Sequence, residues 1–383
     1  MNIVVAAGGT GGHLYPAVAL AREFIRQDPA SAVLFVGTER GIESKVLPRE
    51  GFALAKITAK PVMGRGVRRA VGAVLALPLG LWQSIALLRA RRAQLVIGIG
   101  GYTSPPVLVA AFLLGIPRVI LEPNAYPGLA NKVLGPIADL VFLAFDAAAP
   151  YFRRARVRVV GTPIRRAFYD AGEGAVSGRQ GRKTLLVFGG SQGAHAINQA
   201  MVEALPHLRA EREGLAVIHQ TGEADHGWVK EAYRTAGFEA QAEVVPFLFD
   251  MPRAVQSADL VVSRSGAVSL AELTACGKAA ILIPLPTAIY HHQERNARVM
   301  EGAGAAVVLL QQDLTGPKLA QTIEALLGDR DRLLSMGGRS RALGRTDSAE
   351  SIVRDCLTLV GGTHDVDKSG HGAARTRSCG GAS

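Results

Sequence analysis

Two glycine-rich turns in this chain each follow a short apolar strand and precede a helical pattern. The first is Gly8-Gly9-Thr10-Gly11-Gly12-His13, and the second is Gly189-Gly190-Ser191-Gln192-Gly193. Glycines let backbone N–H groups come close to a ligand, and the N-terminus of a helix favours negative charge. The chain therefore has two candidate sites for phosphate-like anions.

A third glycine-rich turn, Gly98 to Tyr102, follows the predicted strand Leu95–Ile97, and Glu122-Pro123-Asn124 follows the next predicted strand. The carboxyl ends of parallel strands open on one edge of a doubly wound sheet, so His13, Tyr102, Glu122 and Asn124 are predicted to converge on one crevice. A base, a hydroxyl, a carboxylate and an amide together suit acid–base catalysis. Taken singly, each is equally well explained as a local cap or hydrogen-bonding group.

A segment of small residues in the second half, Ser263 to Glu272, begins a helix directly after a predicted strand. Its backbone N–H groups are available for a diphosphate or a sugar, and Glu272 is placed to accept hydrogen bonds from ribose hydroxyls. His291 and His292 are adjacent in sequence, which is poor geometry for chelation on a helix, so no metal site is predicted.

Two common nucleotide-binding motifs are absent. No Gly-Lys-Ser/Thr follows the first turn, so it is not a Walker A loop. Leu14 occupies the third glycine position of the dinucleotide fingerprint, and Gly37 follows the second strand where a ribose-binding acid is expected. The sequence therefore disfavours a nicotinamide-dependent dehydrogenase.

The elements that must position these groups alternate between strand and helix, and the alternation restarts near residue 184. Short apolar strands without clean alternation are typical of a parallel sheet covered on both faces. The fold class is therefore α/β with two doubly wound parallel-sheet domains, and the domain change is placed near Gly161. Strands are predicted near 2–7, 32–36, 95–99, 117–122, 139–143, 157–160, 184–188, 215–219, 243–246, 259–262, 279–283 and 306–308. Helices are predicted near 15–27, 40–49, 68–90, 104–114, 127–134, 147–153, 194–209, 225–236, 250–256, 267–275, 292–302, 315–327, 331–345 and 348–359.

Length, charge and cysteine usage limit the function classes. A chain of 383 residues suits two domains, and its net charge of +11 is concentrated in two acid-free basic stretches, 60–92 and 153–166. These stretches favour an anionic partner, although a solvated face is an open alternative. The three cysteines show neither disulfide nor metal spacing, which favours a reducing cytosolic setting, and no signal peptide is predicted. The glycine- and serine-rich tail from 361 to 383 is predicted to be disordered.

The segment Ala70–Leu88 has 19 residues without a charged side chain. Pro78, Gly72 and Gly80 interrupt it, and a spanning helix would divide an α/β domain. We therefore expect an amphipathic or hairpin segment on the surface, in which Leu75, Leu79, Leu81 and Trp82 enter a membrane interface while cations including Arg68 and Arg69 meet anionic head groups. An ordinary buried helix pair is the alternative.

Seven motifs in order resemble the MurG family of bacterial glycosyltransferases (glycosyltransferase family 28) over about residues 1–360. They are Gly8–His13, Gly100–Tyr102, Glu122–Asn124, Gly161–Arg165, Gly189–Gly193, Arg264–Glu272 and His292–Gln293. The resemblance implies a GT-B fold, with two Rossmann-like domains facing a cleft and a final helix that returns to the first domain. The implied division is 1–160 plus 341–360 for an acceptor and membrane-associating domain, 161–340 for the UDP-GlcNAc-binding domain, and 361–383 for the tail.

The implied reaction is inverting transfer of GlcNAc from UDP-GlcNAc to the MurNAc 4-hydroxyl of undecaprenyl-pyrophosphoryl-MurNAc-pentapeptide (lipid I), which gives lipid II for peptidoglycan synthesis. The donor would contact Thr10, Gly11, Gly12, Asn124, Arg165, Ser191, Leu248, Ala267, Val268, Ser269, Leu270, Ala271, Glu272 and Gln293. The acceptor pyrophosphate would lie on Gly9, Gly11, Gly12, Gly100 and Gly101. Leu248-Phe249 departs from the more usual Ile-Asp of the family, and Glu122-Pro123-Asn124 departs from Glu-Gln-Asn.

Inverting transfer needs one base for the acceptor hydroxyl and stabilisation of the departing UDP. His13 is the predicted base and Glu122 the second candidate, with Tyr102 as a positioning group. Arg165 and the amides of the second-domain turns can stabilise the diphosphate, so no metal or organic cofactor is predicted. The expected location is the cytoplasmic face of the cell membrane, as a peripheral protein. The expected partners are UDP-GlcNAc, lipid I, the anionic inner leaflet and possible cell-wall synthesis or division proteins.

Three rival functions stay open at this point. Another lipid-directed GT-B transferase, for example one that acts on diacylglycerol, shares part of the second-domain pattern but leaves His13 and Asn124 unexplained. A non-catalytic membrane adaptor would tolerate loss of His13 and Glu122. A nucleic-acid binder is suggested by the basic stretches, but no helix-turn-helix, finger or aromatic RNA-binding motif supports it.

Overall fold

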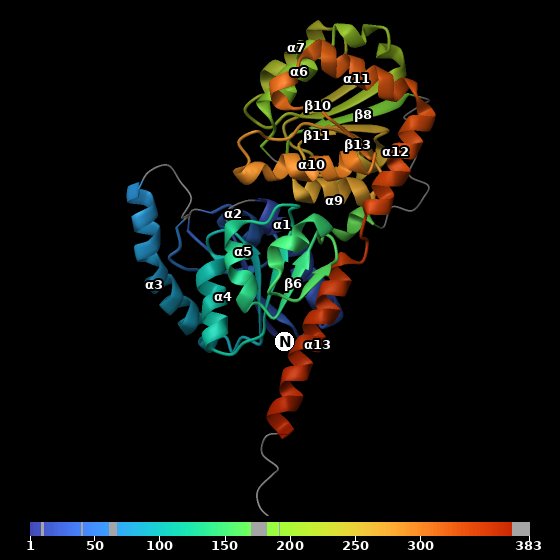
Figure 1. Ribbon diagram of the computed structural model, residues 1–383. Coiled ribbons are helices and arrows are strands. Elements are labelled where there is room, and N and C mark those ends of the chain that lie inside the picture. Colours follow the sequence, from blue (N-terminus) through green and yellow to red (C-terminus); the bar gives the residue numbers. More distant parts are fainter. Residues whose placement is uncertain (9–10, 40, 61–66, 170–181, 191, 370–383) are drawn as a thin grey trace, which may run out of the picture.

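The computed structural model describes residues 1–8, 11–39, 41–60, 67–169, 182–190 and 192–369, and within them the chain forms two parallel β-sheets covered by helices (Figure 1). The first sheet has seven strands in the order β3-β2-β1-β4-β5-β6-β7, and the second has six in the order β10-β9-β8-β11-β12-β13. In both sheets the strand order reverses beside the first strand, β1 or β8. Such a switch point opens a crevice at the carboxyl ends of the strands.

The first sheet and its helices occupy the amino-terminal half. Its strands are β1 Asn2–Ala7, β2 Ala32–Gly37, β3 Ala53–Lys56, β4 Leu95–Gly100, β5 Arg118–Glu122, β6 Leu140–Leu143 and β7 Val157–Val159. Its helices are α1 Gly11–Gln27, α2 Glu43–Arg49, α3 Val67–Ala90, α4 Ser104–Leu113 and α5 Leu129–Leu134, with 3-10 turns η1 Gly135–Ile137 and η2 Asp146–Phe152. The next 3-10 turn, η3 Arg166–Phe168, packs with the second sheet, because Phe168 is buried in that core. Strands β1 and β4 are almost completely buried because helices cover both faces.

The second sheet repeats the plan. Its strands are β8 Lys183–Phe188, β9 Leu215–Gln220, β10 Ala242–Val245, β11 Leu260–Ser263, β12 Ala279–Leu282 and β13 Ala306–Val308. Its helices are α6 His195–Ala204, α7 His226–Thr235, α8 Met251–Ser257, α9 Ala267–Ala275, α10 His292–Gly302, α11 Gly316–Gly328 and α12 Arg330–Leu343, with 3-10 turns η5 His207–Arg209, η6 Arg212–Gly214, η7 Ile289–His291 and η8 Gln311–Asp313. The predicted α/β class with two parallel sheets is confirmed.

The last helix, α13 Ser348–Ser369, returns to the first sheet and packs against α1 (Figure 1). Ile352, Val353 and Cys356 are fully buried in the core that also contains Leu14 of α1. The predicted disorder from residue 361 is wrong for residues 361–369, because α13 continues to Ser369; residues 370–383 lie outside the described residues.

The structure differs from the sequence prediction at two places and agrees with it at a third. Strand β3 was not expected, because its four residues Ala53–Lys56 are only partly buried and show no apolar run. The predicted helix near 147–153 is a 3-10 turn, η2, with Pro150 inside it. The predicted helix near 68–90 is confirmed as α3, which is one continuous helix rather than a hairpin and runs through Pro78 at one side of the first domain (Figure 1).

Candidate active site

His13 lies in the first turn of α1, at the carboxyl edge of the first sheet, as the sequence predicts. A Cβ built on Gly100 would lie 3.2 Å from His13 Nε2, so the imidazole packs directly on the turn that follows β4. Burial, together with the nearby positive charge of His292, lowers the pKa of His13 to about 4. The imidazole is therefore neutral at pH 7 and able to accept a proton.

Close backbone packing requires glycine in each of the two domains' turns. Gly101 has φ +76°, and a Cβ there would lie 2.3 Å from the Gly8 carbonyl oxygen. Gly193 has φ +75°, and a Cβ there would lie 1.9 Å from the Thr221 carbonyl oxygen. Any side chain at either position would force neighbouring strand ends apart. The glycine turns thus hold adjacent strand ends together as well as exposing N–H groups.

Glu122 is a buried carboxylate with a complete set of donors. Oε1 accepts from the Asn124 backbone N–H at 2.9 Å and from Asn124 Nδ2 at 3.2 Å, and Oε2 accepts from the Gly128 N–H at 3.0 Å and from Asn131 Nδ2 at 2.9 Å. Burial raises the pKa of Glu122, while these hydrogen bonds counteract the increase. Because all four hydrogen bonds come from the loop after β5 and the start of α5, Glu122 shapes the segment 122–131 and is poorly placed to take a proton from a substrate.

Tyr102 is tied to a second buried carboxylate that the sequence analysis did not single out. The Tyr102 hydroxyl lies 3.2 Å from Thr38 Oγ1, and Glu43 accepts from the Thr38 backbone N–H at 2.9 Å. Glu43 is fully buried, and a Cβ on Gly37 would lie 2.4 Å from Glu43 Cγ. Gly37, which lacks the acid of a dinucleotide site, therefore makes room for Glu43 beneath the first glycine turn.

Gln220 connects the loops around the predicted diphosphate and uracil sites. Its Nε2 donates to the Gly190 carbonyl at 2.7 Å, and its Oε1 lies 3.5 Å from the Leu248 N–H. Leu248 is half-buried, whereas the unusual Phe249 is 88% exposed. Of the other predicted residues, Gly9, Thr10 and Ser191 lie outside the described residues.

Glu272 on α9 faces Arg165 across the predicted diphosphate region. Arg165 Nη2 lies 3.8 Å from Glu272 Oε1, and the guanidinium also lies over the Phe168 ring at 5.3 Å. Burial raises the pKa of Glu272 to about 7, although Arg165 opposes the increase. Among the described residues, Arg165 is the ion-pair partner of Glu272, and their separation of 3.8 Å is long for such a pair.

Helix α10 brings the second domain onto the first-domain loop. Asn296, completely buried, accepts from the Ala125 N–H at 2.8 Å and donates to Asn124 Oδ1 at 3.2 Å and to the Ser265 carbonyl at 3.3 Å. Gln293, one turn earlier, accepts from the Leu285 N–H at 3.0 Å. No sequence motif predicts this role for Asn296, because only the tertiary structure shows that it joins the two domains.

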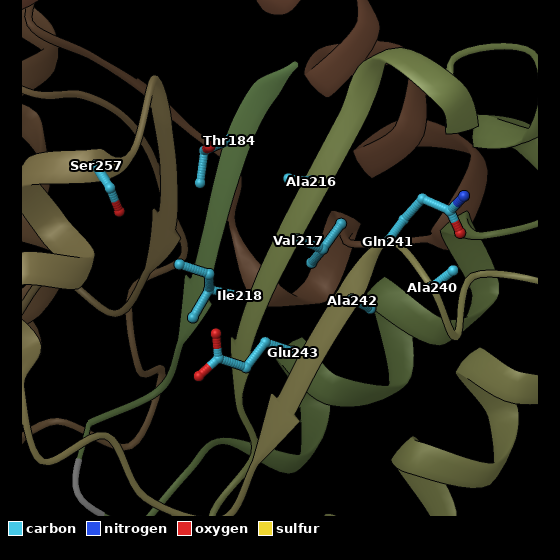
Figure 2. A pocket seen from close by; sticks show the side chains of 9 residues that line it. All are labelled: Thr184, Ala216, Val217, Ile218, Ala240, Gln241, Ala242, Glu243 and Ser257. Carbon is cyan, nitrogen blue, oxygen red and sulfur yellow. The ribbon is translucent and has the colours of Figure 1, made fainter. Parts of the chain in front are cut away.

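Three other residues that are predicted to bind UDP-GlcNAc lie on the side of α9 that lines a cavity between the domains. An interdomain cavity of about 180 Å³ is lined by Ala267, Leu270 and Ala271 together with residues that include Phe145 of the first domain and Thr162 at the domain boundary. A second cavity, of about 130 Å³, lies at the amino ends of β8, β9 and β10 and is lined by residues that include Thr184 and Glu243 (Figure 2). That cavity is at the opposite sheet edge and contains none of the predicted site residues.

Models of two protein domains match this chain. The glycosyltransferase family 28 N-terminal domain matches residues 3–143, and the glycosyltransferase family 28 C-terminal domain matches residues 184–352. The chain belongs to glycosyltransferase family 28. Its two sheets facing an interdomain site are the GT-B architecture of that family.

Similar proteins place the chain in the MurG group of the family. Proteins of Syntrophus aciditrophicus (strain SB) and Myxococcus xanthus (strain DK1622) are each 46% identical over 360 residues, covering 94% of this chain and 99% and 93% of theirs. Both are named UDP-N-acetylglucosamine--N-acetylmuramyl-(pentapeptide) pyrophosphoryl-undecaprenol N-acetylglucosamine transferase.

Solved structures agree on the fold. The crystal structure of Acinetobacter baumannii MurG matches with a TM-score of 0.76 at 30% identity, covering 93% of this chain and 99% of that one. A UDP co-structure of S. aureus MnaA matches with a TM-score of 0.64 at 16% identity, covering 92% and 95%, and shows the fold alone.

The remaining predictions concern metals and the membrane. Among the described residues, no group of three or more His, Cys, Asp or Glu side chains is arranged to hold a metal ion. None of the helices searched in the described part of the chain combines the length and apolarity needed to cross a bilayer. Trp82 and Leu79 on α3 are 67% and 48% exposed, and Arg68, Arg69 and Leu75 belong to the amino-terminal part of the same helix.

Proposed function

We propose that this chain transfers GlcNAc from UDP-GlcNAc to the MurNAc 4-hydroxyl of undecaprenyl-pyrophosphoryl-MurNAc-pentapeptide (lipid I), with inversion, to form lipid II in peptidoglycan synthesis. The names of relatives that are 46% identical over nearly the whole chain support this substrate pair. The observation that carries the proposal is that His13 packs on Gly100 at the carboxyl edge of the first sheet, near enough to His292 at the start of α10 for the two imidazoles to interact electrostatically. That start is where a donor sugar would meet an acceptor hydroxyl.

The donor is assigned to the second domain and to Asn124. Arg165 and the amides of the turn around Ser191 stabilise the diphosphate, and Glu272 accepts from the ribose hydroxyls. Gln293 and Asn124 hold the sugar from opposite sides of the cleft, and the Leu248 backbone contacts the uracil. The segment Ala267–Ala271 supplies N–H groups at the start of α9.

The acceptor pyrophosphate is assigned to the first glycine turn and to Gly100 and Gly101. In the transfer step, the acceptor oxygen forms a bond to the anomeric carbon while the bond from that carbon to the UDP oxygen breaks. His13 takes the hydroxyl proton, and UDP leaves with the electron pair. Bound pyrophosphate and diphosphate would raise the pKa of His13 from its low value towards neutrality, which suits a general base.

Glu122 and Tyr102 receive supporting roles in this proposal. The four hydrogen bonds of Glu122 favour a function in shaping the loop that presents Asn124 rather than in proton transfer. Tyr102, held through Thr38, positions the acceptor.

We also propose peripheral attachment to the anionic cytoplasmic face of the membrane through α3. The exposed side chains Leu77, Leu79 and Trp82 supply apolar surface, and Arg68 and Arg69 supply charge. The carboxyl half of the helix anchors this surface to the domain, because Leu88 is buried and Gln83 accepts from the Thr58 N–H at 2.6 Å.

A direct assay tests the proposed function. Purified protein should release UDP from UDP-GlcNAc with a lipid I analogue and should not do so with diacylglycerol. UDP release with diacylglycerol alone would overturn the proposed acceptor. Absence of turnover with either acceptor, while UDP-GlcNAc still binds, would favour an adaptor.

A further inference from the structure

Three tyrosines and two cations form a cluster that joins the two domains beside the candidate active site. Tyr126 follows β5, Lys132 lies on α5 and Tyr151 lies on η2, all in the first domain. Tyr290 lies on η7 and Arg295 on α10, both in the second domain. We refer to these five residues as the tyrosine clasp.

Tyr126 is at the centre of the tyrosine clasp. Lys132 Nζ lies 4.2 Å from the Tyr126 ring centroid and 3.1 Å from its hydroxyl, and Arg295 Cζ lies 4.2 Å from the same centroid. The Tyr151 ring is 4.9 Å away and nearly perpendicular, and the Tyr290 ring is 5.5 Å away. One ring thus receives a cation from each domain and an aromatic neighbour from each domain.

The tyrosine clasp is continuous with groups assigned to the donor sugar. Asn124 and Ala125, immediately before Tyr126, are the residues that Asn296 bonds, and Asn296 immediately follows Arg295. Gln293 is two residues before Arg295. Contacts at Tyr126 therefore act on the same two segments, 122–128 and 289–296, that hold Asn124 and Gln293.

The second-domain segment needs such contacts because its backbone is strained. Tyr290 and His291 have φ values of +56° and +52°, although neither is glycine. Two consecutive left-handed residues persist only when their surroundings fix them, and such strain concentrates at functional segments. The Tyr290 ring packs near Tyr126 and Lys132, at 5.5 and 5.2 Å, so the clasp holds one of the two strained residues just before α10 begins.

We propose that Tyr126 is a positioning residue that holds the loop 122–128 against the start of α10, so that Asn124 and Gln293 face each other across the donor sugar. The inference rests on the proposed function, because it assigns the sugar to these two side chains. The clasp acts through stacking of cations on rings, which requires an aromatic ring but not a hydroxyl at position 126.

Three single variants and one double variant test this role. Tyr126→Phe keeps the ring and should keep kcat within about two-fold, whereas Tyr126→Leu keeps apolar bulk but loses the ring and should lower kcat about ten-fold. Arg295→Leu should lower kcat by several-fold, and the Tyr126→Leu/Arg295→Leu double variant should be little worse than Tyr126→Leu because the two residues act on one another. UDP affinity, which depends on second-domain turns, should stay within about two-fold. Trp228→Ala, at an exposed aromatic on α7 away from the clasp, is the control.

Two outcomes would overturn the inference. If Tyr126→Leu turns over at the wild-type rate, the clasp does not position the reaction. If Tyr126→Phe loses as much activity as Tyr126→Leu, or if the two single losses multiply in the double variant, ring stacking is not the cause.

A measurement without substrate separates this inference from the proposed function. Hydrogen exchange of the full chain should speed up in both 122–128 and 289–296 in Tyr126→Leu and in neither segment in Tyr126→Phe. If the wild-type protein transfers no GlcNAc but the exchange result holds, the proposed function fails while the clasp stands. Unchanged exchange in the second-domain segment would refute the clasp whatever the activity.

Discussion

Glu122 on the first-domain side of the cleft and Glu272 on the second-domain side are both buried, and they are held very differently. Glu122 in the first domain accepts four hydrogen bonds from Asn124, Gly128 and Asn131, all within the segment 122–131. Glu272 in the second domain has an arginine at 3.8 Å, and its pKa rises to about 7. One carboxylate is built into the scaffold, and the other is left for a ligand to complete.

The two carboxyl groups differ in how far hydrogen-bond donors of the protein replace the water that each loses on burial. Around Glu122, four hydrogen-bond donors replace the water that a buried carboxyl group loses, and they oppose the rise in pKa that burial causes. Glu272 lacks that replacement in the described contacts, so its charged form is costly until donors arrive. The first-domain crevice is therefore preorganised, whereas the second-domain crevice is expected to change its protonation when UDP-GlcNAc binds.

The largest expected effect is the loss of activity when His13 is removed, because His13 is proposed to act in the reaction and not in holding the fold. His13→Ala should lower kcat by about 1,000-fold, because it removes the proposed base, with little change in the melting temperature. Steady-state UDP release and a thermal melt measure the two quantities. His207→Ala, at an exposed position in the second domain, is the matched control. A His13→Ala enzyme that keeps kcat within ten-fold would move the base elsewhere in the crevice.

Removing the first-domain carboxylate should affect folding as well as activity. Glu122→Ala leaves the buried donors of Asn124, Gly128 and Asn131 without an acceptor and should lower the free energy of unfolding by about 3 kcal/mol. Denaturant unfolding measures the loss. The same substitution at Glu272 should cost less than about 1 kcal/mol; equal losses at both positions would refute the contrast between the two carboxylates.

Glu272, the second-domain carboxylate, should make both stability and the KM for UDP-GlcNAc depend on pH. Its pKa is about 7 in the folded protein and about 4.5 when unfolded, so the folded state holds an extra proton between these values and Glu272 stabilises the fold less as pH rises through that window. Ribose hydroxyls donate to the ionised form, so KM for UDP-GlcNAc should fall about ten-fold between pH 6 and 8. Glu272→Gln should flatten this dependence; a KM profile identical to that of the wild type would exclude Glu272 as its source.

The smallest expected effect concerns membrane binding through α3, a surface away from both Glu122 and Glu272. Trp82→Ala should weaken binding to anionic vesicles about five-fold, and added salt should weaken binding of both wild type and variant because it screens the basic residues. Co-sedimentation measures both effects, and Trp228→Ala is the control on the second domain. Turnover of a soluble acceptor should not change. Vesicle binding that ignores both salt and Trp82 would refute the proposed membrane surface.

Much of the architecture was predictable from local pattern. The apolar strands Ile3–Ala7 and Thr184–Phe188 and the glycine turns after them are contiguous in sequence, so both parallel sheets and the place of His13 followed from them. Strand β3 was missed because an exposed edge strand needs little apolar character. The continuation of α13 past Gly361 was missed because polar composition favoured disorder over a helix.

The sequence by itself determined which chemical groups stand at strand ends, because a strand, a glycine turn and a helix start are local features. Tertiary structure alone decided which of those groups have all their hydrogen-bond partners within the protein and which groups meet across the cleft. Glu122 and Glu272 are the same residue type, yet only folding supplies four donors to one and a distant arginine to the other. Asn296 and Tyr126 act between domains because chain segments about 170 residues apart come into contact, a relation that no local pattern encodes.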